Sequence, residues 1–162
     1  MSTAIQLQNT LSRAREELVP REPGKVSLYV CGVTPYDALH IGHARAFMAY
    51  DVLRRVLEAR GYNVTHIQNV TDVEDKIIER AKQVGVEALE LARRFSDEAL
   101  EDTYALGILP AHQYPRVSDS MPEIIDMVRV LEEKGAAYAR GSAAGSNSIA
   151  NHAQRGTQTQ MG

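Results

Sequence analysis

The chain has 162 residues, a single cysteine and a formal net charge of −3 at pH 7. Its apolar fraction of 44% and charged fraction of 24% are typical of a globular protein whose one domain buries a substantial core. The slightly acidic balance gives no sign of a broad nucleic-acid-binding face. One cysteine excludes an internal disulfide, and the chain has neither a signal peptide nor an apolar run of about 20 residues. We therefore predict a cytoplasmic protein that does not enter a membrane.

The first predicted strand follows an opening segment of mixed character. Apolar and polar residues alternate around Ile5 and Leu7, a polar and charged segment continues to Pro20, and Pro23–Gly24 marks a turn. The run 26–31 is short and contains Val, Leu and Tyr, which predicts a buried parallel strand.

A helix and a second strand are predicted next. Over 44–60, apolar residues recur at helical spacing, and Gly61 follows as a C-terminal cap. The predicted inward stripe consists of Ala49, Val52, Leu53, Val56 and Leu57. A strand over 62–70, with Val64 and Ile67 in the core, completes a right-handed βαβ unit. Its first loop lies at the carboxyl edge of the sheet, where open α/β sheets bind ligands.

Three further helices are predicted. The first has Thr71 or Asp72 as its N-cap and ends at Gly85. Its apolar face consists of Val73, Ile77, Ala81 and Val84. The second covers about 86–106, with inward residues Ala88, Ala92, Phe95 and Ala99. The third opens with a capping box at 120–123 and ends at Gly135, with Ile124, Met127, Val128 and Leu131 along it.

The last segment differs in character from the rest. Residues 141–162 contain no Asp, Glu or Lys, and Gly, Ser, Asn, Gln and Thr dominate. This composition predicts a flexible or disordered tail.

The stretch 31–46 leads from the first strand through a glycine-containing loop into a helix. It places His40 and His43 at a helix N-terminus, where unpaired N–H groups and the helix dipole favour an anion such as a phosphate. Gly42 between them has no side chain, so a flat ligand has access to the backbone. Taken alone, two histidines at this spacing are more often capping or core residues. The strand before them and the helix after them favour a nucleotide site.

These residues resemble the signatures of a known family. His40-Ile41-Gly42-His43 resembles the HIGH signature of class I aminoacyl-tRNA synthetases. Cys31-Gly32 upstream, with Thr34, Tyr36 and Asp37 between, makes the cysteinyl-tRNA synthetases the closest match. Residues 69–78 are similar to that family's NxTDxxDKII segment, and the resemblance covers roughly residues 4–140.

The resemblance implies an α/β fold, the first half of a class I (HIGH-type) Rossmann-like nucleotide-binding domain with parallel strands. Residues 1–140 would form this N-terminal part of the catalytic domain, including helices of the connecting insertion, and residues 141–162 the tail. The implied reaction activates L-cysteine with ATP as the adenylate and transfers it to tRNA-Cys. The Lys-Met-Ser-Lys-Ser loop and the second half of the fold are not recognisable, so we expect a monomeric fragment that is inactive alone.

The resemblance also implies roles for individual residues. His40, Gly42 and His43 would bind ATP with its Mg²⁺, and the two histidines would be catalytic by stabilising phosphate charge as the adenylate forms. Thr71 and Thr34 would contribute to the cysteine pocket. The cysteine that matches Cys31 ligates a zinc ion that also takes the substrate thiolate, and soft sulfur suits zinc.

Several readings stay open at the level of single residues. A role as a helix cap explains Thr71 and Asp72 equally well. Arg45 is either a plain surface residue or the partner of a ligand or carboxylate. Zinc takes about four ligands. The remaining histidines have no ligand spacing with Cys31 and are expected in a strand, a loop and the tail: His66, His112 and His152.

Two alternative functions also stay open. One is the related cysteine ligase of mycothiol biosynthesis, whose signature also uses Thr-Pro-Tyr-Asp, although the sequence at 76–80 fits the tRNA enzyme better. The other is a non-catalytic module that binds ATP or cysteine without releasing pyrophosphate.

Overall fold

The computed structural model describes residues 4–140 and 148–151. The chain divides into two compact units, 1–117 and 118–162, which are described separately below. Most of the predicted tail over 141–162 lies outside the described residues, while four residues of that range, Ser148–Asn151, form a strand. The flexible tail therefore stays a prediction.

The first unit opens with a hairpin that the sequence analysis did not predict. Strands β1 (Gln6–Asn9) and β2 (Ala14–Glu17) pair antiparallel. All four residues of β2 are exposed and three are charged, so no buried face marks the strand in the sequence. The Asn9 Nδ2 group donates to Glu16 Oε2 across the pair at 2.8 Å.

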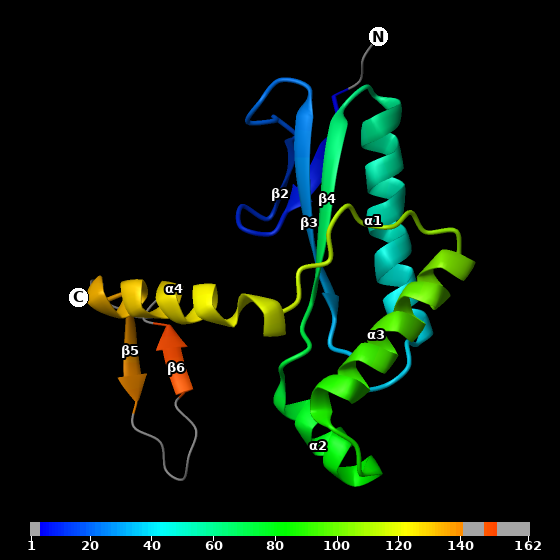
Figure 1. Ribbon diagram of the computed structural model, residues 1–162. Coiled ribbons are helices and arrows are strands. Elements are labelled where there is room, and N and C mark those ends of the chain that lie inside the picture. Colours follow the sequence, from blue (N-terminus) through cyan, green and yellow to red (C-terminus); the bar gives the residue numbers. More distant parts are fainter. Residues whose placement is uncertain (1–3, 141–147, 152–162) are drawn as a thin grey trace, which may run out of the picture. The chain divides into compact units, whose positions relative to one another are not determined.

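The centre of this unit is a βαβ unit, as predicted. Strands β3 (Lys25–Val33) and β4 (Asn63–Val70) pair in parallel, and helix α1 (Ile41–Ala59) connects them (Figure 1). A third extended segment, not predicted, runs alongside β4, where Ile67 bridges Gln113 and Val70 bridges Arg116, both in parallel.

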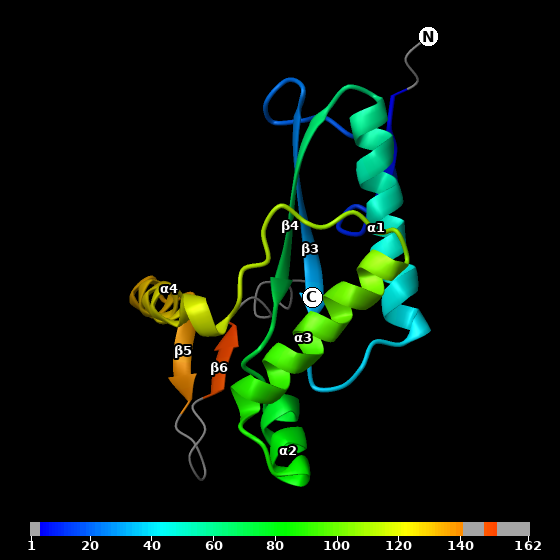
Figure 2. The ribbon, with the colours of Figure 1, turned by 45° about the vertical axis from the view of Figure 1, so that its right-hand side comes forward.

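Only one face of the parallel pair is well covered. Figures 1 and 2 both show α1 and α3 on the same side of the strands, and Val30 and Val64 are buried. On the other face, Tyr29 is 66% exposed and Cys31 is also exposed. The prediction of a buried strand is therefore wrong for this face, since no described residue covers these two side chains.

The buried face of α1 differs from the predicted stripe. Leu57 is buried as expected, but Val52 is 54% and Val56 41% exposed. Phe47 and Asp51 are buried instead. Burial of Asp51 is possible because its carboxylate accepts from Arg55 Nε at 2.7 Å and from the Leu109 N–H at 3.0 Å.

Helices α2 (Asp75–Val84) and α3 (Ala88–Ala105) pack against each other. Their shared core confirms much of the predicted pattern and consists of Ile77, Ala81, Leu91, Ala92 and Phe95. Val73 and Val84 are 43% and 45% exposed, so the predicted face of α2 is wrong at both ends.

The N-cap of α2 also differs from the prediction. Glu74, not Thr71 or Asp72, is the cap, and its Oε2 accepts from the Lys76 N–H at 2.9 Å. Val70 ends β4, so the chain needs several residues between strand and helix, and the cap moves downstream. Thr71 and Asp72 are therefore left for other contacts.

The second unit contains a 3₁₀ turn (Ser118–Ser120), helix α4 (Met121–Glu133), and strands β5 (Ala137–Arg140) and β6 (Ser148–Asn151), which pair antiparallel. The predicted capping box does not form. The 3₁₀ turn gives Ser120 a ψ of 12° rather than the extended backbone of a good cap, and its side chain makes no capping hydrogen bond. No residue of α4 is buried. Among the residues that the structure describes, no helix is long and apolar enough to cross a membrane.

Candidate functional site

The loops that follow β3 and β4 carry the predicted site residues. Residues 34–40 connect β3 to α1, and residues 71–74 connect β4 to α2. Because β3 and β4 are parallel, both loops lie at the same carboxyl edge (Figure 2). Open α/β sheets bind their ligands at this edge.

His40 and His43 cap α1 reciprocally. His40 is the N-cap, with extended backbone at φ −123° and ψ 169°, and its Nδ1 accepts from the Gly42 N–H at 3.1 Å. In return, His43 Nδ1 accepts from the His40 N–H at 3.3 Å. The ring centroids lie 4.0 Å apart. This pattern is a capping box built from two imidazoles instead of the usual hydroxyl and carboxylate.

The reciprocal cap fixes the protonation of both rings. Since each Nδ1 accepts an N–H, a neutral ring must carry its proton on Nε2. Burial, and then the nearby charge of His40, lower the pKa of His43 below its usual value. The lowered pKa favours the neutral ring of His43, which carries its proton on Nε2 at a helix N-terminus, where anions are favoured.

The structure gives a further reason for glycine at position 42, one that the sequence pattern does not reveal. A Cβ at this position would lie 2.8 Å from His40 Cε1 and 2.9 Å from His40 Nδ1. The His40 ring folded back over the first turn therefore requires glycine here, apart from any ligand.

The loop that begins at Thr34 and leads into α1 contacts α2. Lys76 Nζ lies 5.7 Å from the centroid of the Tyr36 ring, and Arg80 Nη2 lies 3.7 Å from Asp37 Oδ2. Pro35 is fully buried. Thr34 is half-buried, and its carbonyl accepts from the Tyr36 N–H at 3.0 Å. These contacts bring the loop of the first motif against the helix of the second.

The side chain of Asn69 joins the ends of β3 and β4. The sequence pattern alone gives no sign of this contact. Asn69 Oδ1 accepts from the Gly32 N–H at 2.8 Å, and Asn69 Nδ2 lies 3.3 Å from Thr71 Oγ1. Cys31 directly precedes this contact. Its neighbour Gly32 has no room for a side chain, since a Cβ there would lie 1.6 Å from the Asn69 carbonyl oxygen.

Asp72 is buried beside an arginine far away in sequence. It is 4% exposed, and its Oδ2 lies 3.9 Å from Arg116 Nη1, which is also 3.5 Å from Ser96 Oγ. Asp72 thus links the end of β4 to the 112–117 segment and to α3. Only the fold brings Arg116 here, so nothing in the sequence pattern signals the pair. Arg45, by contrast, is exposed.

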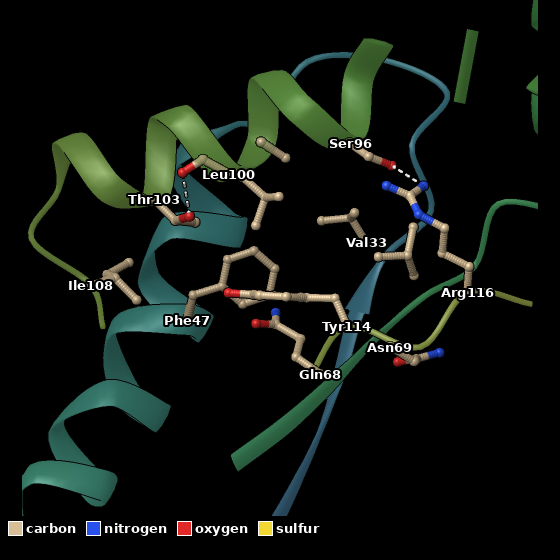
Figure 3. Close-up of a pocket in the computed structure, with 12 residues that line it drawn as sticks. Val33, Phe47, Gln68, Asn69, Ser96, Leu100, Thr103, Ile108, Tyr114 and Arg116 are labelled. Carbon is tan, nitrogen blue, oxygen red and sulfur yellow. Dashed lines mark hydrogen bonds between the residues drawn. The ribbon is translucent and has the colours of Figure 1, made fainter. Parts of the chain in front are cut away.

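One pocket of the first unit contains none of the predicted site residues. It has a volume of about 40 Å³, room for little more than water, and lies between α1, α3 and the end of β4 (Figure 3). Phe47, Leu100 and Tyr114 point into it, with Asn69 and Arg116 at one end. None of the six predicted site residues lines it. It is too small for a nucleotide.

The side chains around Cys31 do not form a complete zinc site within the described residues. No three His, Cys, Asp or Glu side chains lie together among the described residues. His66 is buried in β4, and His112 lies in the segment after α3, where its Nδ1 accepts from the His66 N–H at 2.9 Å. His152 lies outside the described residues. Cys31 is therefore one possible ligand, and the described part of the chain does not complete a tetrahedral set.

Comparison with known proteins gives a consistent result. A family model described as tRNA synthetases class I (C) catalytic domain matches residues 17–159. A cysteine–tRNA ligase from Halalkalibacterium halodurans is 51% identical over 138 residues, which cover 85% of this chain and 30% of that protein. One from Thermococcus kodakarensis is 51% identical over 134 residues, 83% of this chain and 28% of that protein. The chain thus spans less than a third of the length of these curated relatives.

Solved structures agree on the fold. A Mycobacterium tuberculosis methionyl-tRNA synthetase in complex with methionyl-adenylate matches with a TM-score of 0.64 and 26% identity, over 70% of this chain and 23% of that one. An Agrobacterium radiobacter LeuRS, in a ternary complex with tRNA and LeuAMS, matches with a TM-score of 0.62. At 24% identity, over 76% of this chain and 17% of that one, it supports the fold alone. The α/β fold with a parallel sheet was predicted correctly. The chain belongs to the family of class I (C) tRNA synthetase catalytic domains, the family of its cysteine–tRNA ligase relatives.

Proposed function

We propose that this chain is the N-terminal part of a cysteine–tRNA ligase catalytic domain and provides its ATP site at the start of α1. The observation that carries the proposal is the reciprocal cap of His40 and His43. The cap uses both Nδ1 atoms and leaves two Nε2–H donors beside the positive end of a helix dipole. That arrangement suits a polyphosphate better than it suits a neutral ligand.

The proposed chemistry at this site is electrostatic. His40 and His43 donate hydrogen bonds to phosphate oxygens of ATP, which arrives with its Mg²⁺. They stabilise the charge that shifts when the L-cysteine carboxylate attacks the α-phosphate, the bond to the β-phosphate breaks and pyrophosphate leaves. Neither histidine forms a covalent bond. Donors already fixed by the cap need little reorganisation during the reaction, which is the physical advantage of this arrangement.

The amino-acid pocket is proposed at Thr71 and Thr34, on the same carboxyl edge of the sheet. The contacts of Tyr36 and Asp37 with α2 support it, because they hold the loop of Thr34 against the segment after Thr71. Cys31 would be one ligand of a zinc ion, which would supply selectivity for a thiolate. The described residues do not complete that site. We also propose tRNA-Cys as the acceptor, a cytoplasmic location and a monomeric state.

A nucleotide titration tests the proposal. ¹⁵N-labelled protein is titrated with ATP and Mg²⁺, and we expect the amide resonances of residues 40–43 to move in a saturable way. The amides of α4 lie in the second unit and serve as the internal control. Saturable shifts confined to α4, or no shifts at 40–43 at millimolar ATP, would contradict the assignment of the site.

A further inference from the structure

Asn69 joins two strands at a point where their regular pairing is interrupted. The parallel register of β3 and β4 shifts between Val30 and Val33, so the backbone ladder is broken there. Within that interval the Gly32 N–H donates to the Asn69 side chain at 2.8 Å instead. The amide side chain thus replaces a bond of the sheet and ties the end of β3 to the end of β4.

The two contacts of Asn69 determine which way its amide faces. A backbone N–H only donates, so the Asn69 atom facing Gly32 is the oxygen. The amide nitrogen must then face Thr71 Oγ1, 3.3 Å away. An amide NH₂ only donates, so the Thr71 oxygen accepts and its own hydroxyl proton is not used in this contact. The order of donors is therefore Gly32, Asn69, Thr71.

We propose that Asn69 is a positioning residue that makes Thr71 a hydrogen-bond donor toward an acceptor atom of the bound amino acid, a carboxylate or thiolate. This inference rests on the proposed cysteine pocket at Thr71. Asn69 holds the Thr71 oxygen at a fixed place relative to Gly32, the residue next to Cys31. The proton of the Thr71 hydroxyl is then available to donate to the ligand. Thr71 is half-buried and does not cap α2, so no competing helix role occupies its side chain.

The substitution Asn69→Asp tests the donor order with almost no change in shape. The introduced carboxylate still accepts from the Gly32 N–H, but its second oxygen also accepts, so the Thr71 hydroxyl turns toward it and loses its proton for the ligand. We expect the Gly32 amide to keep its protection from hydrogen exchange. We also expect the dissociation constant for L-cysteine, measured by NMR titration of the labelled chain, to rise by at least about tenfold.

Two variants at Thr71 separate this effect from the added charge. Thr71→Val removes the hydroxyl and should weaken L-cysteine binding to a similar extent, while Thr71→Ser should restore binding close to that of the natural chain. In the Thr71→Val background, Asn69→Asp should cause no further loss. In the same experiments, Thr71→Val should shift the Asn69 side-chain amide resonances, and Thr71→Ser should leave them in place.

The outcomes distinguish this inference from the proposed function. Unchanged L-cysteine binding in Asn69→Asp, or a further loss of binding in the double variant, would overturn the inference and leave the cysteine pocket standing. Absence of L-cysteine binding in the natural chain would overturn the pocket assignment and the inference together.

Discussion

His43 has one observed role and one proposed role. Its Nδ1 completes the cap of α1, and its Nε2–H is the proposed donor to a phosphate. A simple alanine substitution removes both, so a loss of binding would not reveal which one matters. A substitution that keeps an acceptor for the His40 N–H separates them. Glutamate at this position of a capping box is such an acceptor.

We therefore predict different outcomes for two substitutions. His43→Ala should lower both the stability of the fold and ATP binding, each lost contact being worth roughly 0.5–3 kcal/mol. His43→Glu should keep the thermal midpoint, because the carboxylate caps the helix and suits its dipole. It should lose ATP binding by at least about tenfold, because it replaces a donor with a negative charge. Melting curves and nucleotide titrations measure the two quantities.

The exposed Gln83 of α2 offers a matched control for charge. Gln83→Glu adds the same charge away from the start of α1 and should bind ATP as the natural chain does. If His43→Glu binds ATP normally while folded, His43 is a capping residue only.

The histidines also predict a pH dependence of stability. Burial is the main cause that lowers the pKa of both His43 and His66, and Arg54 and His112 lower that of His66 further. The unfolded chain, with histidine pKa values near 6.5, takes up protons before the folded chain does. Stability is therefore complete above that value and falls as the pH drops from about 7 to 5. Urea unfolding across this range measures it.

A substitution of His66 tests which histidine causes the fall in stability at low pH. His66 is 4% exposed, and neither ring nitrogen has a hydrogen-bond partner among the described residues. His66→Leu should flatten the fall in stability toward pH 5 without lowering stability at pH 7.5, because an apolar side chain leaves no unsatisfied polar group. A large loss at pH 7.5 would indicate that the imidazole has a partner that stabilises the fold.

At the scale of elements, the local sequence pattern predicts the order of the strands and helices of the βαβ unit, α2 and α3 correctly. It predicts only part of which helix and strand faces are buried. The βαβ unit and the positions of α2 and α3 follow from runs of apolar residues and from turn residues, which act locally. The hairpin of β1 and β2 has no apolar face to mark it. The stripe on α1 was misassigned because Asp51 is buried through contacts with Arg55 and Leu109, which the sequence does not reveal.

The same difference between local and distant contacts applies to the site. His40, Gly42 and His43 lie within one turn of chain, so their association with a helix N-terminus was predictable. The contact of Asn69 with Gly32 and that of Asp72 with Arg116 join distant segments, and they depend on strand register. A cap at Thr71 or Asp72 was chemically reasonable but wrong, because the chain after β4 delays the start of α2 to Asp75.

A pair of substitutions in α2 checks the corrected cap. Glu74→Ala should destabilise the first unit by about 1 kcal/mol, the usual effect of losing an N-cap side chain. Glu79→Ala, an exposed substitution of the same kind within the helix, should change stability by less than about 0.5 kcal/mol. Chemical denaturation of both variants is the measurement. Equal effects would mean that the Glu74 contact contributes nothing.

For the molecule as a whole, the bare face of β3 is the main feature. Parallel sheets occur almost only with both faces covered, yet Tyr29 and Cys31 are exposed, and among the described strands β3 pairs with β4 alone. On α1, Val52 and Val56 add further exposed apolar surface. The curated relatives are more than three times as long as the matched segment. In the proposed ATP site, the proposed donors all come from the start of α1.

We therefore predict that the 162-residue chain binds ATP but shows little or no cysteine-dependent exchange between ATP and pyrophosphate. Binding needs the donors at the start of α1, whereas catalysis needs the charge developing in the transition state to be stabilised from all sides. Radiolabelled pyrophosphate exchange is the measurement. Turnover in the range typical of enzymes, about 1–100 per second, would contradict this prediction.

Cys31 lies on that bare face, and its chemistry tests whether the proposed zinc site is complete. One thiolate is a weak zinc site, because a structural zinc contributes folding energy only through a full tetrahedral set. We expect less than one zinc per chain after extensive dialysis, a melting curve that a chelator leaves unchanged, and rapid alkylation of the exposed thiol. Cys31→Ser should remove the alkylation and any residual zinc while leaving the melting curve in place. One tightly held zinc per chain, lost together with stability, would mean that residues beyond the described part of the chain complete the site around Cys31.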